Sequence, residues 1–108
     1  MQVDSKRMKK AAGDASGLFS ILSNPRRLMI LCRLVDGEAS VGELAEFSDS
    51  AQTAVSQQLA VLRNVGLVST RRDGQTIYYS LSSAPARMIM EAAYGAFCAP
   101  AGKTRAYK

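Results

Sequence analysis

The sequence predicts a mainly α-helical domain that carries one small β-hairpin. Apolar residues recur every three or four positions over most of the chain, which is the period of amphipathic helices. One stretch instead places β-branched and aromatic residues on both sides of the dipeptide Asp73-Gly74, which is a hairpin signal. The chain has only 108 residues, so a single domain accounts for it.

Composition narrows the class of protein. Fourteen Lys and Arg against nine Asp and Glu give a net charge of +5, which favours a polyanionic partner such as nucleic acid. Histidine is absent, and with it the commonest metal ligand and the general base of most catalytic triads. We therefore expect no catalytic residue, no cofactor and no bound metal. The chain shows neither a membrane-spanning apolar run nor a signal peptide, so we expect a cytoplasmic protein without a membrane partner.

The first predicted helix covers residues 5–22 and has a basic outer face near its start. A second helix begins at Asn24-Pro25 and stops at Gly37. Its asparagine can cap free backbone amides, and the proline ring is preset for the first helical turn. Cys32 lies on or beside the apolar stripe of this helix, so its side chain is expected to face or border the interior.

Two short helices come next. Ser40 and Glu43 have the spacing of a capping box at the start of the segment VGELAEF. After a turn, a fourth helix covers residues 51–64, and Gly66 just beyond this range is its stop signal. Two short helices joined by a tight turn, the second rich in exposed amide and hydroxyl groups, are typical of a helix-turn-helix. The side chains of the fourth helix expected to contact DNA are Gln52, Thr53, Ser56, Gln57, Gln58 and Arg63.

The hairpin LVSTRRDGQTIYYSL follows, with a type I′ turn expected at Asp73-Gly74. A last helix, ARMIMEAAYGAFC, ends at Cys98. Such a hairpin after a helix-turn-helix is a wing, and its arginines suit phosphates or the minor groove. The wing residues expected to contact DNA are Arg71, Arg72, Gln75 and Thr76.

This order of elements is that of a winged helix-turn-helix. Residues 1–17 are expected to form an N-terminal extension and the start of a dimerisation helix, 18–98 the DNA-binding and sensor domain, and 99–108 a flexible basic tail. Because a domain of this size buries a limited core, we expect a homodimer through the terminal helices. The alternative to DNA binding is that the polar residues are only solvated surface. Charge, wing and helix polarity together favour double-stranded DNA.

Four segments in order, NPRRLMILCRL, SVGELAE, AVSQQLAVLRNVGLV and RRDGQTIYYSL, resemble the ArsR family of winged-helix repressors over residues from about 18 to 98. The resemblance implies a homodimeric repressor that binds operator DNA and leaves it when an inducer acts. Many relatives sense metals through a cysteine pair in the third helix or through carboxylate and histidine ligands in the last, and neither set is present here.

Cys32 and Cys98 instead occupy positions that resemble the persulfide-sensing branch of this family. That resemblance implies that the two sensor thiols meet in the fold and become joined by a disulfide or polysulfide bridge. The inducer would be a low-molecular-weight persulfide or polysulfide, and the controlled genes would serve sulfide detoxification. The aliphatic neighbours of Cys32 are expected to raise its pKa.

The sequence departs from the family pattern in the turn before the fourth helix. Ser48, Ser50 and Ala51 replace the usual leucines and serine, and we expect Ser50 or Asp49 to supply the missing helix cap. Gln58 stands where relatives commonly have histidine, so it keeps hydrogen-bonding capacity but does not titrate.

Three other functions stay open. The same thiols could serve a repressor that responds to arsenite or to an oxidant. A constitutive DNA-binding protein would ignore thiol reagents. A thiol enzyme is the third alternative, and the lack of a CxxC motif, of histidine and of an anion-binding loop argues against it. Helical period alone would make Cys32 a core residue, whereas the two occupied family positions favour a sensor.

Overall fold

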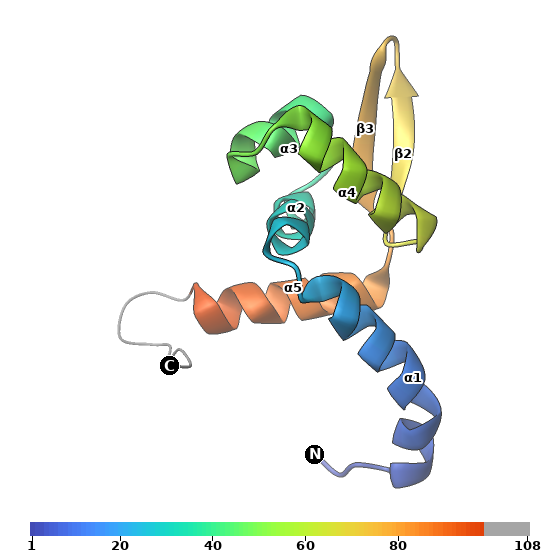
Figure 1. The fold of residues 1–108 in the computed structure, drawn as a ribbon. Coiled ribbons are helices and arrows are strands. Elements are labelled where there is room, and N and C mark those ends of the chain that lie inside the picture. Colours follow the sequence, from blue (N-terminus) through green and yellow to red (C-terminus); the bar gives the residue numbers. More distant parts are fainter. Residues whose placement is uncertain (99–108) are drawn as a thin grey trace.

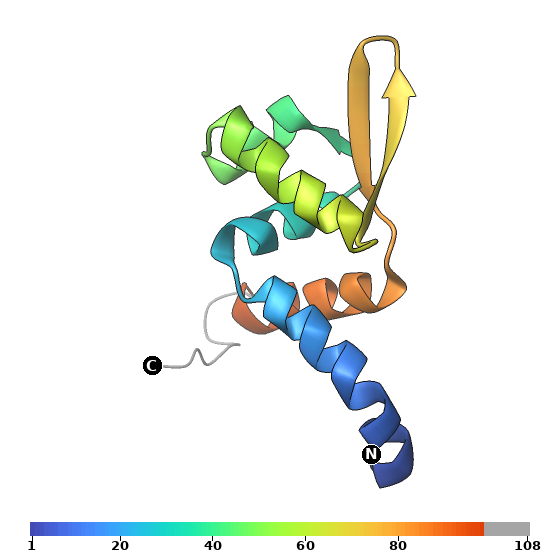
Figure 2. The same cartoon turned by 45° about the vertical axis from the view of Figure 1, so that its right-hand side comes forward.

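The computed structural model of the chain describes residues 1–98, and it confirms a mainly helical winged helix-turn-helix (Figures 1 and 2). The predicted tail at 99–108 lies outside the described residues. In chain order the elements are α1 (Ser5–Leu22), α2 (Pro25–Val35), β1 (Ala39–Ser40), α3 (Val41–Ser48), α4 (Gln52–Asn64), β2 (Val68–Asp73), β3 (Thr76–Leu81) and α5 (Ala84–Phe97).

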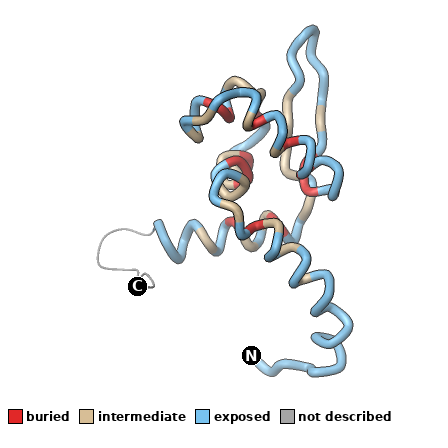
Figure 3. The backbone as a smooth tube through the Cα atoms, in the orientation of Figure 1, coloured by how far each residue is buried: buried red, intermediate tan, exposed pale blue. Residues whose placement is uncertain are grey.

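The hydrophobic core is organised around α2. Its side chains Ile30, Leu31 and Leu34 have no exposed surface, and α3, α4 and α5 pack against this helix. Figure 3 shows that buried backbone positions gather where these helices meet and that the outer parts of α1, α5 and the wing are exposed. The core is completed by buried apolar residues of the neighbouring elements, namely Leu44, Val55, Leu59, Leu62, Ala86 and Met90.

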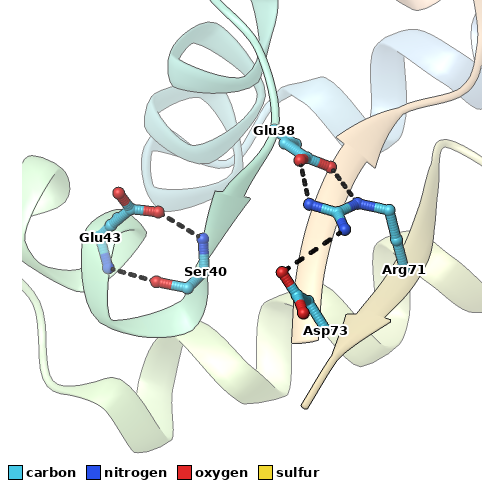
Figure 4. Close-up of polar contacts among 5 residues, drawn as sticks. All are labelled: Glu38, Ser40, Glu43, Arg71 and Asp73. Carbon is cyan, nitrogen blue, oxygen red and sulfur yellow. Dashed lines mark hydrogen bonds and ion pairs between the residues drawn. The ribbon is translucent and has the colours of Figure 1, made fainter. Parts of the chain in front are cut away.

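Two helix starts follow the local chemistry that the sequence predicts. The Asn24 side chain accepts a hydrogen bond from the backbone N–H of Arg27 at 3.1 Å, with Pro25 in the first turn. At the start of α3 the Ser40 hydroxyl accepts from the Glu43 N–H at 3.2 Å. The Glu43 carboxylate in turn accepts from the Ser40 N–H at 2.9 Å, which completes the capping box (Figure 4).

The prediction that Ser50 or Asp49 caps α4 is wrong. Ala51 occupies the cap position, and no side chain accepts a hydrogen bond from the first turn. Ser50 donates its hydroxyl to the Ser48 carbonyl at 3.2 Å. Asp49 takes a left-handed conformation, with φ of 51°, in which it ends α3. Both candidates are therefore used to build the tight turn rather than to cap the next helix.

The sheet holds one strand more than the predicted hairpin. The two-residue strand β1 pairs antiparallel with β3, which gives the order β1-β3-β2. The hairpin turn is also displaced by one residue, since Asp73 pairs with Thr76 and the turn centre is Gly74-Gln75. Gly74 has φ of 64°, and among residues 1–98 the only non-glycine residue with positive φ is Asp49. A type I′ turn needs positive φ at both centres, so the expected turn type is wrong and glycine at the first centre fits type II′.

The terminal helices leave apolar surface uncovered. The first half of α1 extends away from the body of the molecule, on the side opposite the wing (Figures 1 and 2). Within the described residues, Leu22 is the only buried residue of α1. On α5, the side chains of Met88 and Phe97 are exposed by 69% and 59%. None of the described helices combines the length and apolarity needed to cross a membrane.

The capping box predicts a stability effect. Replacing Ser40 with alanine removes the acceptor of the Glu43 N–H and should lower the free energy of unfolding by about 1 kcal/mol. Chemical denaturation measures this value. Ser20→Ala, on the exposed face of α1, is the matched control and should cause no comparable loss. Equal stability of Ser40→Ala and the unmodified protein would contradict the role of the cap.

Candidate nucleic-acid interface and thiol pair

The second helix of the helix-turn-helix, α4, presents one apolar face and one polar face. Val55, Leu59 and Leu62 are fully buried and fix the orientation of the helix against the core. Five of the six side chains expected to contact DNA are exposed on the remaining surface, namely Gln52, Thr53, Ser56, Gln57 and Arg63. Amide, hydroxyl and guanidinium groups can read base edges or bind phosphates, so this face has the chemistry of a recognition helix.

Gln58 has a different environment from the other five. Its side chain is half-buried, and its amide oxygen accepts a hydrogen bond from Arg27 Nε of α2 at 2.7 Å. The Arg27 guanidinium also reaches the Ile21 carbonyl at 3.5 Å. Gln58 therefore attaches the recognition helix to α2, and sequence reasoning missed this role because its partner lies 31 positions away.

The fold brings the start of α4 next to the wing. Gln52 and Ser56 of α4 line a cleft of about 500 Å³ together with Gln75 and Thr76 of the wing. Further along α4, Ser56 and Arg63 line a second hollow that Tyr79 of β3 closes. Residues predicted from two separate segments thus line two adjoining clefts that share Ser56 and Tyr79.

The two wing arginines differ in their contacts. Arg71 lies over the ring of Tyr78, with its guanidinium carbon 4.9 Å from the ring centroid. Its Nε donates to Glu38 Oε2 at 3.1 Å and its Nη2 to the other carboxylate oxygen (Figure 4). Asp73 lies 3.9 Å from Nη1. The hydrogen bonds from Arg71 lower the pKa of the Glu38 carboxyl and raise the pKa of Arg71. Arg72 donates to the Gly74 carbonyl at 3.3 Å and forms no ion pair within residues 1–98.

Cys32 and Cys98 are both free, and they belong to two elements that pack together: Cys32 lies on α2, and Cys98 directly follows α5. Cys32 is half-buried, and Cys98 is exposed at the end of α5, where its N–H donates to the Tyr94 carbonyl at 2.8 Å. Burial raises the pKa of the Cys32 thiol, and the negative charges of Cys98 and Asp36 raise it further.

A pocket of about 350 Å³ gives access to Cys32. It lies between α2, α3 and α5, so a small thiol reagent can approach the half-buried sulfur from solvent. Across residues 1–98, no group of three or more His, Cys, Asp and Glu side chains is arranged to hold a metal ion. The other residues that line this pocket are Val35, Asp36, Phe47, Met90, Glu91 and Tyr94.

One polar contact joins the two helices that carry the thiols. Arg87 of α5 donates from Nη1 to the Val35 carbonyl at the end of α2, at 3.2 Å. The sequence offered no local signal for this contact, because the two residues are 52 positions apart. Glu38 was missed for the same reason, since its partner Arg71 is 33 positions away.

The chain is similar to known bacterial regulatory proteins in both sequence and structure. The sequence pattern described as "Bacterial regulatory protein, arsR family" matches residues 24–70. The chain is 46% identical to a biofilm growth-associated repressor of Agrobacterium fabrum over 86% of this chain and 80% of that protein. It is 43% identical to the transcriptional activator HlyU of Vibrio cholerae over 86% of each chain. The crystal structure of the transcriptional repressor BigR from Xylella fastidiosa superimposes with a TM-score of 0.84, at 44% identity, over 91% of this chain and all of that one.

The different environments of Gln57 and Gln58 predict different effects of the same substitution. Gln58→Ala leaves the Arg27 guanidinium without its partner and should lower the free energy of unfolding by about 1 kcal/mol. Gln57→Ala removes an exposed side chain and should change that energy by less than about 0.5 kcal/mol while weakening operator binding. Thermal denaturation and fluorescence anisotropy measure the two effects. If the two variants were equally stable, the attachment role of Gln58 would be wrong.

The raised pKa of Cys32 predicts slow alkylation near neutral pH. The rate of its reaction with iodoacetamide should rise with pH through a midpoint above that of an unstructured cysteine peptide. In Cys98→Ser this midpoint should move down, because one of the nearby negative charges is lost. Peptide mass spectrometry across a pH series follows the reaction. A midpoint at or below the peptide value would contradict the effect of burial.

Proposed function

The chain belongs to the ArsR family of bacterial regulatory proteins, and from this premise we propose that it is a homodimeric repressor controlled by two thiols. In the proposed mechanism it binds operator DNA while Cys32 and Cys98 are reduced. Reactive sulfur species then join the two thiols and release the protein from DNA. The observation that supports the proposal is that Tyr94 of α5 lines the pocket beside Cys32 and accepts the backbone hydrogen bond of Cys98.

Members of this family are DNA-binding transcriptional regulators rather than enzymes. Here the exposed polar face of α4 and the wing supply the groups that would contact the duplex, and the net charge of +5 would attract it. Gln52, Thr53, Ser56 and Gln57, which are exposed, would contact base edges. Arg63 and Arg72 would bind phosphates.

The proposed dimer is supported by the apolar surface of the terminal helices. Met8 and Phe19 of α1 and Met88 and Phe97 of α5 are each at least 46% exposed. Soluble monomers seldom leave so many large apolar side chains in water along two helices. Pairing with a second copy would cover them, and a twofold axis would present two α4 helices to two half-sites of an operator.

The sulfur chemistry balances with two molecules of a persulfide, RSSH. The Cys32 thiolate attacks the terminal sulfur of the first, which gives Cys32-SSH and expels the thiolate RS⁻. The new persulfide attacks a second RSSH in the same way, which gives Cys32-SSSH and a second RS⁻. The Cys98 thiolate then attacks the first added sulfur and expels HS⁻. The product is a trisulfide between the two cysteines, and the oxidant is the sulfane sulfur that leaves as sulfide.

A route from the thiols to the DNA runs along α2. Arg27, which holds Gln58 of the recognition helix, lies about one and a half turns before Cys32 on the same helix. A bridge that draws Cys32 and Cys98 together would shift α2 against α5 and move α4 with it. Release requires only a difference in DNA affinity between the two states, and a tenfold difference corresponds to about 1.4 kcal/mol.

A gel-shift assay on the DNA upstream of the coding sequence tests the proposal. The reduced protein should bind, and a persulfide donor should release it. Cys32→Ser and Cys98→Ser should bind equally well, which also shows that they fold, and neither should be released. Release of Cys32→Ser by the donor would rule out the dithiol mechanism.

Mass spectrometry of the treated protein identifies the inducer class. A persulfide donor should add sulfur between the two cysteines. Loss of two hydrogen atoms with peroxide, accompanied by equal release from DNA, would indicate an oxidant sensor. Retained arsenic would indicate an arsenite sensor. A protein that binds DNA and ignores all three reagents would be a constitutive DNA-binding protein.

A further inference from the structure

The contact between Glu38 and Arg71 crosses the whole sheet. Arg71 belongs to β2, and Glu38 directly precedes β1, which lies at the opposite edge beyond β3. The Arg71 side chain passes over the ring of Tyr78 of β3. Its guanidinium meets both carboxylate oxygens of Glu38 (Figure 4). Tyr78 of β3 is paired with Arg71 of β2 on one side and with Ser40 of β1 on the other. The strand register therefore brings Arg71 level with the start of β1, next to Glu38.

The contact between Arg71 and Glu38 contributes little to the stability of the fold. The side chains of Arg71 and Glu38 are 53% and 40% exposed, and exposed ion pairs contribute little to folding because water and salt screen them. The sheet is already held by the backbone pairing of its three strands. The contact lies on the wing, however, where a free arginine would meet DNA.

A carboxylate and a phosphate bind a guanidinium in the same way, through two parallel hydrogen bonds. Glu38 therefore occupies the groups of Arg71 that a DNA phosphate would need. From this geometry we propose that Glu38 is an internal competitor of DNA phosphate for Arg71. It weakens the sequence-independent part of DNA binding and so increases the preference for the operator.

The effect on specificity follows from the two kinds of contact. Phosphate contacts supply nearly all of the affinity for random DNA, whereas base contacts distinguish the operator. Blocking one wing arginine reduces the affinity for random DNA and leaves the base-reading groups of α4 unchanged. Arg72 provides the internal comparison, because it is the next residue along β2, points to the other face of the strand and has no carboxylate partner within residues 1–98.

Two other roles for Glu38 predict different results. If Glu38 held Arg71 in the position that binds DNA, removing its charge would weaken binding. If Glu38 only repelled the duplex from a distance, removing its charge would strengthen binding whether or not Arg71 were present. Competition predicts stronger binding that depends on Arg71.

Fluorescence anisotropy with a random-sequence duplex over a series of salt concentrations distinguishes these roles. The variants are Glu38→Gln, Arg71→Gln and the double variant, with Asp14→Asn on exposed α1 as the control for net charge. Glu38→Gln should bind more tightly at low salt. Each newly freed arginine should steepen the dependence of log K on log salt by about 0.9, so raising salt from about 50 to about 200 mM should cost this variant about threefold more affinity per wing, or about tenfold for a dimer.

In the Arg71→Gln background, Glu38→Gln should have no effect on the affinity or on the salt dependence. Asp14→Asn should leave the salt dependence unchanged, and equal melting temperatures should show that all variants are folded. Weaker or unchanged binding by Glu38→Gln would overturn the proposal, as would an equal gain in the Arg71→Gln background. The inference rests on DNA binding and not on the thiols. Failure of the unmodified protein to bind its upstream DNA would refute the proposed function itself, before any variant is compared.

Discussion

The burial of one face of α2 is the constraint on which the rest of the structure depends. Ile30, Leu31 and Leu34 have no exposed surface, and each such side chain stabilises the fold by about 1.5–3 kcal/mol relative to exposure. The helices α3, α4 and α5 all pack against this one helix. Neither α4 nor α5 can move without changing how α2 is packed.

Specific polar contacts join α2 to its neighbours on both sides. Arg27 fixes α4 through Gln58, and Arg87 of α5 binds the carbonyl at the end of α2. Cys32 lies between these two contacts along the same helix. The proposed covalent change at Cys32 would therefore act on a helix that packs against both α5 and α4. Contiguous packing of this kind is a physical basis for coupling two sites.

The net charge of +5 does not show that part of the positive charge of the wing is compensated by nearby carboxylates. Glu38 and Asp73 lie beside Arg71 of the wing, while Arg72 forms no ion pair with any other residue among 1–98. The positive field of the wing is therefore weaker than its two arginines imply. The exposed polar face of α4, which is proposed to read bases, contains no carboxylate.

The sequence by itself determined the features whose causes lie within a few residues. The caps at Asn24 and Ser40 depend on side chains that reach amides three positions away, and the helical periods depend on neighbouring turns. Only the tertiary structure decided the partners of Gln58, Glu38 and Arg87 and the third strand of the sheet. These contacts join residues 31 or more positions apart, and they form because packing around α2 brings distant segments together, which no local pattern records.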